Sequence, residues 1–168
     1  ALKCGKDGYF NGLKFNNTAL LCCAFASAVD SLMALKKFVY DDKRVSLEEF
    51  SAALDANWQG FEKLRLQIRN SPIKYGNNNP EADRYAAAIA DYYSGRVNNI
   101  PNGRGGVYKA IMHSARTFIE QGKKTLASAD GRKNGDILSK NASPCDGMDK
   151  NGVTALIESA LRLTLSNF

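Results

Sequence analysis

The stretch that decides the fold, residues 129–159, reads ADGRKNGDILSKNASPCDGMDKNGVTALIES. The part up to residue 152 holds four glycines among Asp, Asn, Ser and Pro residues: Gly131, Gly135, Gly147 and Gly152. This composition predicts successive turns, because glycine adopts positive φ easily and the short polar side chains bond their own backbone. We therefore expect a long loop over these residues, either ordered or disordered.

The pattern changes at Val153, where apolar residues begin to recur with the period of a helix. They fall on one face of a 3.6-residue repeat: Val153, Leu156, Ile157, Ala160 and Leu161. An apolar face of this kind is typical of a helix that packs against a core. The sequence thus predicts a loop that leads into a buried helix.

The sequence of the loop resembles that of the corresponding loop in one family, the pyruvate formate-lyase-like glycyl radical enzymes. The resemblance is carried by DGRKxG at residues 130–135 and PxxGxDKxGVTA at residues 144–155. One departure is that Ala129 stands where the family usually has proline, so the start of the loop is less rigidly set.

Two further blocks resemble the same family in the same chain order. AVDSLxALKK at residues 28–37 is similar to the family's Ala-Asp-Ser-Leu helix, and YGNNNP at residues 75–80 is similar to its Tyr-Gly-Asn-Asp turn. Three ordered blocks are more specific than a single motif. The resemblance covers the chain from about Ala19 onward.

This resemblance implies an α/β fold, in which residues 1–168 are a single, predominantly helical segment of a ten-stranded β/α barrel. Enzymes of this family carry a cysteine on one central loop and a glycine on another. A radical-SAM activating enzyme converts that glycine to a radical, which draws hydrogen from the cysteine to start the reaction on a small-molecule substrate. Family members are formate C-acetyltransferases or enzymes that eliminate water or an amine from diol-like molecules, all in anaerobic metabolism.

Neither essential residue of the family can be located in this sequence. The glycyl motif resembles Arg-Val-x-Gly-Tyr, and its nearest likeness, residues 96–99, has no glycine. The pair Cys22 and Cys23 directly precedes the Asp-Ser-Leu block, whereas the family's active cysteine lies far upstream of it. We expect two buried structural cysteines, no catalytic residue and no bound cofactor in this chain, with the glycyl radical on a residue outside it.

Composition and charge restrict the class of protein. The chain has 168 residues, of which 44% are hydrophobic and 24% charged, as in a soluble globular protein. Its net charge is +6, and its 23 Lys and Arg residues are scattered among 17 acidic residues. This pattern favours a solvated surface over a nucleic-acid or membrane site. No apolar run reaches the length of a membrane span.

The cysteines and the one histidine argue against a metal site and favour a reducing compartment. Four cysteines lack C-x-x-C spacing, and a single histidine accompanies them. We interpret them as reduced thiols, which predicts the cytoplasm. Residues 14–28 imitate a secretion signal, but the apolar pattern continues into a helix, which a cleaved signal has no reason to encode.

Several helices are expected between the three blocks. The first covers about Thr18 to Tyr40, and a capping box of Ser46 and Glu49 starts the second. A third helix follows Gly60 and ends before Pro72, with Phe61, Leu64 and Ile68 inward. A fourth begins at Asn79 and Pro80, with an apolar face of Ala82, Tyr85, Ala86, Ile89, Tyr92 and Tyr93, and ends at Gly95.

Residues 107–120 leave two alternatives open. Their apolar spacing fits a helix, whereas the family resemblance places a barrel strand and its following loop there. His113 and Ser114 lie in this segment, but adjacent residues point in different directions and no nucleophile elbow surrounds the serine. The resemblance instead implies that His113 and Ser114 border the substrate pocket.

Our hypothesis is that the chain is an internal segment of a glycyl radical enzyme, similar to formate C-acetyltransferase (pyruvate formate-lyase), and inactive alone. Its partners would be the remainder of that polypeptide and the activating enzyme. The alternative is a free-standing binding or subunit module on the same scaffold, and a weaker one is a nucleic-acid-binding protein.

Overall fold

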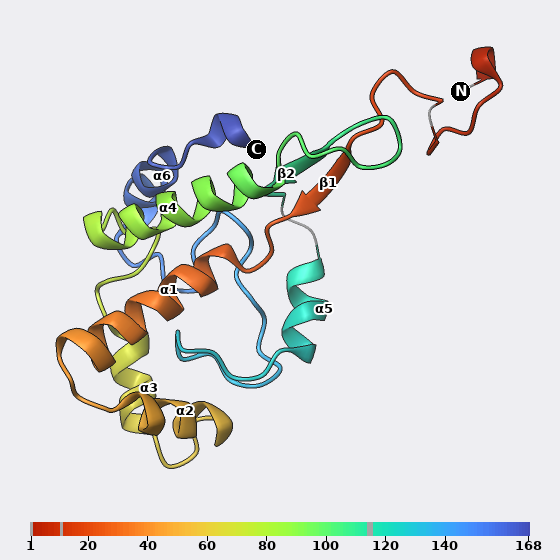
Figure 1. Ribbon diagram of the computed structural model, residues 1–168. Coiled ribbons are helices and arrows are strands. Elements are labelled where there is room, and N and C mark those ends of the chain that lie inside the picture. Colours follow the sequence, from red (N-terminus) through yellow and green to blue (C-terminus); the bar gives the residue numbers. More distant parts are fainter. Residues whose placement is uncertain (1, 11, 114–115) are drawn as a thin grey trace.

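The computed structural model describes residues 2–10, 12–113 and 116–168 (Figure 1). In chain order it contains η1 (Leu2–Cys4), β1 (Thr18–Leu21), α1 (Phe25–Leu35), the π-helical turn η2 (Lys36–Asp41), α2 (Leu47–Asp55), α3 (Glu62–Arg69), α4 (Pro80–Val97), β2 (Tyr108–Ile111), α5 (Thr117–Lys124), α6 (Gly152–Leu161) and η3 (Leu165–Asn167). The chain is therefore mostly helical with one small sheet, as the sequence predicts.

The sheet is a parallel pair of β1 and β2, in register from Thr18 opposite Tyr108 to Leu21 opposite Ile111. The predicted start of the first helix at Thr18 is wrong. Pairing with β2 holds residues 18–21 extended, and Ala24 has a left-handed φ of 63°, which interrupts any helix before Phe25. The apolar periodicity of the sequence carries no information about this long-range pairing.

The two alternatives for residues 107–120 each describe a part of the segment. Tyr108–Ile111 forms strand β2, and α5 begins at Thr117. The strand therefore lies where the family resemblance predicts it. The helical spacing applies only to the end of the segment.

The predicted starts of two helices are confirmed. Ser46 Oγ accepts from the Glu49 amide at 3.1 Å while the Glu49 carboxylate accepts from the Ser46 amide at 2.9 Å, which completes the capping box of α2. Asn79 Oδ1 accepts from the amides of Glu81 and Ala82, both at 3.1 Å, ahead of Pro80 in the first turn of α4. These caps satisfy amides that a helix start leaves unpaired.

The predicted end of the fourth helix is wrong by two residues, since α4 continues through Gly95 to Val97. A single helical glycine costs only about 1 kcal/mol, and Val97 beyond it is buried. Tyr92, assigned to the apolar face, is instead 71% exposed.

The core has two parts. In the first, α1 packs against α4, and Phe25 meets Tyr75 edge to face with their ring centroids 5.5 Å apart. In the second, α2 and α3 cover the end of α1 (Figure 1), with Phe50 and Trp58 edge to face at 5.8 Å. Both parts of the core contact the long loop that follows α5.

The last helix, α6, is less buried than its pattern predicts. Its apolar residues Val153, Ile157 and Leu161 are exposed by 70%, 50% and 70% of their surfaces, and Ser159 is its one buried residue. The helix forms as expected, but no described part of the chain covers that apolar face. None of the helices in the described ranges is long and apolar enough to cross a bilayer.

Candidate functional site

The loop of residues 125–151 contains the candidate site, and it is ordered around the buried side chain of Arg132. Arg132 as a whole residue is 3% exposed. Its guanidinium donates to the carbonyl oxygens of Thr125, Leu126, Lys133 and Asp136 and to Ser128 Oγ. A planar group with five donors suits this task, because it can satisfy several buried carbonyls from one centre.

The turn between α2 and α3, together with α3, holds the same motif from outside. Trp58 Nε1 donates to the Arg132 carbonyl at 3.0 Å, and Arg65 Nε donates to the Gly131 carbonyl at 2.7 Å. Gly131 has a φ of 90°, and a β-carbon there would lie 2.7 Å from the Arg69 side chain. The glycine of the Asp-Gly-Arg motif is therefore required both by its conformation and by its close packing.

Helix α1 holds the middle of the loop through its serines. The Ser27 amide donates to Ser139 Oγ at 2.9 Å, and the Ser139 amide donates to Ser27 Oγ at 3.1 Å. One turn further along, Ser31 Oγ accepts from the Asp130 amide at 3.2 Å. The helix of the Asp-Ser-Leu block thus presents a polar edge that replaces the secondary-structure bonds the loop lacks.

The Tyr-Gly-Asn-Asn turn holds the end of the loop. Asn77 Nδ2 donates to the Met148 carbonyl at 2.7 Å, and Asn77 Oδ1 accepts from the Asn151 amide at 3.0 Å. Gly76 has a φ of 88°, and a β-carbon there would lie 2.7 Å from Pro144. All three blocks that carry the family resemblance therefore meet in space.

A cluster of buried ionisable groups lies where these blocks meet. Asp30 is 1% exposed, its Oδ1 accepts from the Tyr75 amide at 2.9 Å, and its Oδ2 lies 3.6 Å from Lys74 Nζ. Burial raises the pKa of Asp30 to about 6, although Lys74 and the Tyr75 amide oppose the shift. Burial also raises the pKa of the Cys145 thiol well above its usual range, so the thiol stays protonated and can donate to Asp130 Oδ2, 3.8 Å away.

The sequence patterns do not predict this cluster. Asp30 lies inside the Asp-Ser-Leu block and Lys74 directly precedes the Tyr-Gly-Asn turn, and neither pattern marks its charged residue as buried. The signal that could have indicated the cluster is the presence of charged residues inside otherwise apolar or turn motifs, because a buried charge needs a partner.

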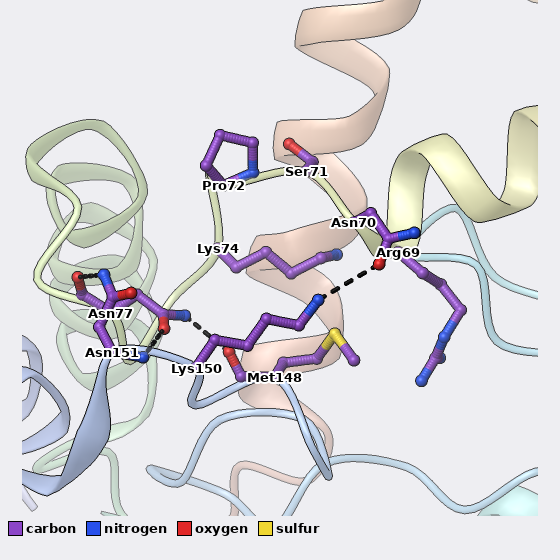
Figure 2. A pocket seen from close by; sticks show the side chains of 9 residues that line it. All are labelled: Arg69, Asn70, Ser71, Pro72, Lys74, Asn77, Met148, Lys150 and Asn151. Carbon is purple, nitrogen blue, oxygen red and sulfur yellow. Dashed lines mark hydrogen bonds between the residues drawn. The ribbon is translucent and has the colours of Figure 1, made fainter.

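Two cavities flank the cluster. One, of about 180 Å³, is drawn in Figure 2 and is lined by Arg69, Asn70, Ser71, Pro72, Lys74, Asn77, Met148, Lys150 and Asn151. The other, of about 410 Å³, is lined on the loop side by Asp130, Arg132, Ser139 and Cys145. Within the described ranges, no cluster of His, Cys, Asp and Glu residues could hold a metal ion.

Of the two predicted pocket residues, His113 belongs to the part of the chain that the structure describes. His113 is exposed just after β2 and lines neither cavity. Ser114 lies outside the described residues. The assignment of His113 and Ser114 to a substrate pocket stays a prediction.

Cys22 and Cys23 carry free, half-buried thiols at the end of β1. Burial, followed by the neighbouring Cys23, raises the pKa of Cys22 to about 11. A thiol that stays protonated at neutral pH is a poor nucleophile. This supports the structural interpretation of Cys22.

Comparison with known proteins identifies the family. Residues 1–122 match the Pyruvate formate lyase-like family. The chain is 33% identical over 159 residues to trans-4-hydroxy-L-proline dehydratase of Clostridioides difficile and 34% identical over 164 residues to (2S)-3-sulfopropanediol dehydratase of Klebsiella oxytoca. Each match covers 95% of this chain and 20% of the relative.

A solved structure gives the same result. The hydroxyproline dehydratase of Clostridioides difficile, with trans-4-hydroxy-L-proline bound, superposes with a TM-score of 0.89 at 32% identity. The match covers 97% of this chain and 21% of that one. The chain belongs to the pyruvate formate-lyase-like family of glycyl radical enzymes, and it spans about a fifth of the length of the relatives it matches.

The segment that most resembles the family's glycyl motif holds no glycine. The nearest likeness to the radical motif, residues 96–99, spans the end of α4, where Asn98 caps the helix. The Asn98 side chain there donates to the Asn167 carbonyl at 2.7 Å and accepts from the Ala110 amide at 2.7 Å. These residues are structural.

Proposed function

We propose that the chain is part of the barrel wall of a longer glycyl radical enzyme that eliminates water from a small hydroxylated substrate. The observation that carries this proposal is the match to two enzymes named as dehydratases over 95% of the chain. In this proposal the cysteine and glycine loops that perform the radical chemistry lie in other parts of the polypeptide.

The sheet supports a place in a larger barrel. Two parallel strands of four residues each form a sheet too small to be stable alone, and parallel sheets are normally buried on both faces. Leu20 of β1 is 40% exposed. Further strands on either side of β1 and β2 would complete the ten-stranded barrel that the family resemblance implies.

Exposed apolar side chains also support a larger assembly. Besides the face of α6, they gather on the segment before β1, which extends away from the helices in Figure 1: Leu2, Tyr9, Phe10, Leu13 and Phe15. Large contiguous apolar patches are uncommon on soluble monomers. In our proposal the remainder of the enzyme covers these side chains.

The site itself supports a structural role for this segment. Burial raises the pKa of the Cys22 and Cys145 thiols, and the hydrogen bonds of Trp58, Arg65 and Arg132 fix the Asp-Gly-Arg loop. We infer that the segment positions the loop and strands, in a cytoplasmic enzyme that a radical-SAM enzyme activates.

The test is a substrate comparison with the full-length polypeptide, purified without oxygen and treated with its activating enzyme and S-adenosylmethionine. We expect loss of one water molecule from a diol or from hydroxyproline, measured by mass spectrometry, and no product without activation. Formation of formate and acetyl-coenzyme A from pyruvate would instead assign the formate C-acetyltransferase reaction and overturn the dehydratase proposal.

The alternative of a free-standing module has its own test. A 168-residue chain that is monomeric, melts cooperatively and exposes little apolar surface would favour the module. Aggregation, or strong binding of a hydrophobic dye, would favour a segment of a longer enzyme.

A further inference from the structure

The cleft in Figure 2 has an excess of positive charge and of hydrogen-bond donors. Three of its nine described lining residues, Arg69, Lys74 and Lys150, are cationic, and none of the nine is acidic. The Arg69 guanidinium has five N–H donors, and none of them donates a hydrogen bond to a described residue. Of the three cations only Lys74 forms an ion pair with an acidic residue of the described chain, and this excess of positive charge favours an anionic ligand.

Lys74 is the most restricted of these cations. It is 3% exposed, and its ammonium lies 3.6 Å from Asp30 Oδ2, which is close enough for an ion pair but too long for a good hydrogen bond. The ammonium has three donors, and Asp30 lies on the core side of it. The side of Lys74 that lines the cleft therefore retains donor capacity.

Lys150 approaches the same place from the loop. In Figure 2 the side chains of Lys74 and Lys150 extend in the same direction, toward Asn70. Lys150 Nζ donates to Asn70 Oδ1 at 3.3 Å, and this bond leaves the amide N–H groups of Asn70 available. Ser71 Oγ accepts from the Ile73 amide at 3.3 Å, so its own O–H can also donate.

We propose that this cleft binds a small dissolved oxyanion such as phosphate or sulfate, held between the ammonium groups of Lys74 and Lys150. The anion would relieve the repulsion between the two cations and accept from the Asn70 amide and the Ser71 hydroxyl. Charge-assisted hydrogen bonds of this type are stronger than neutral ones. A cavity of about 180 Å³ has room for a tetrahedral oxyanion.

The site would connect α3, the turn before α4 and the end of the loop. Arg69 and Asn70 close α3, Lys74 precedes the turn, and Lys150 lies two residues before α6 begins. Binding would therefore stabilise the folded arrangement of these elements, because a ligand that binds only the folded state shifts the folding equilibrium.

The test is phosphate binding to the full-length protein that contains these 168 residues, at constant ionic strength against chloride. We expect saturable binding by isothermal titration calorimetry. At ten times the dissociation constant, the ratio of folded to unfolded protein rises roughly elevenfold, which appears as a higher melting temperature.

The variant Lys150→Gln removes one cation from an exposed side chain, so the protein should still fold. We expect it to weaken phosphate binding roughly tenfold. The matched control is Lys63→Gln, which removes the same charge from an exposed position on α3 outside the cleft and should leave binding unchanged.

Three results would overturn the proposal. The first is no saturable binding to the unaltered protein, as expected if a carboxylate from another part of the polypeptide already fills the cleft. The second is unchanged affinity in Lys150→Gln. The third is an equal loss in Lys63→Gln, which would mean that phosphate responds only to net charge.

Discussion

The loop of residues 125–151 and the helix α6 that follows it differ in an instructive way. Most of the loop has no helix or strand, yet Asp130, Arg132, Ser139 and Asn141 are buried in it. Helix α6 has regular backbone bonds but leaves most of its apolar face exposed. Regular secondary structure and burial are therefore separate properties in this chain.

The difference has a physical cause. The loop satisfies its backbone groups with side chains from its own Arg132 and from α1, the turn between α2 and α3, α3 and the turn before α4, so it can be buried without a ladder of backbone bonds. Helix α6 satisfies its own backbone and needs a partner only for its apolar side chains. The described residues thus bury much of the loop, whereas they leave Val153, Ile157 and Leu161 of α6 exposed.

The largest expected effect is from Arg132→Lys. Lysine keeps the charge but cannot reach the carbonyls on several sides, so it leaves buried acceptors unpaired and should destabilise the loop by about 3 kcal/mol or more. We expect amide hydrogen exchange over residues 125–138 to become roughly a hundredfold faster, measured by mass spectrometry. The matched control Arg96→Lys, at an exposed position of α4, should leave exchange unchanged.

The second effect concerns pH and Asp30. Because its folded pKa, about 6, exceeds the ordinary value of 3.8, the folded state holds its proton more tightly than the unfolded state. The resulting stability is fully present below about pH 4 and is lost as pH rises through 6, by about 3 kcal/mol for two pKa units.

The variant Asp30→Asn tests the sign of this change in stability with pH. It should flatten the decline in stability between pH 4 and pH 7, because the neutral amide that replaces the carboxyl group has no proton to lose over this range. A decline from Asp83 remains in the variant, since burial also raises the pKa of that carboxyl group. An unchanged slope in Asp30→Asn would contradict the assignment.

The third effect is from Ser139→Ala, which removes one of the two hydroxyls in the reciprocal pair of hydrogen bonds between Ser27 and Ser139. The Ser27 amide then has no acceptor, which should cost about 1 to 2 kcal/mol. The drop in melting temperature should exceed that of Ser143→Ala, whose hydroxyl makes no such link to α1. Equal drops would mean that the reciprocal bonds do not anchor the loop.

The smallest effect is from Ile157→Ser on α6. In the 168-residue chain alone it should change stability by less than about 0.5 kcal/mol, since exposed substitutions have little effect. In the full-length protein the same change should cost more, because there the side chain is covered. The buried position Ile68 provides a contrast, since Ile68→Ser should destabilise both forms.

Local signals were predictable from the sequence. The capping box of Ser46 and Glu49 and the cap at Asn79 depend on residues a few positions apart, and both formed as expected. The turn-rich loop was also predicted, although not that it would be buried. The family followed from three short motifs, which the comparisons support.

Long-range features were not predictable in the same way. Strand β1 looked helical because its pairing partner lies about ninety residues away. The ion pair of Asp30 and Lys74 joins two motifs that no local sequence pattern connects. The exposure of α6 depends on what surrounds the chain, and an apolar stripe reports only that something should cover it.

Hydrogen exchange of the 168-residue chain and of the full-length enzyme tests the central claim most directly, when the same peptides are followed in both. Our account predicts equal protection in the middle of the loop, residues 128–145, and much stronger protection of β1 and α6 in the full-length protein. Equal protection of β1 and α6 in both forms would contradict it, because this chain would then need no covering surface.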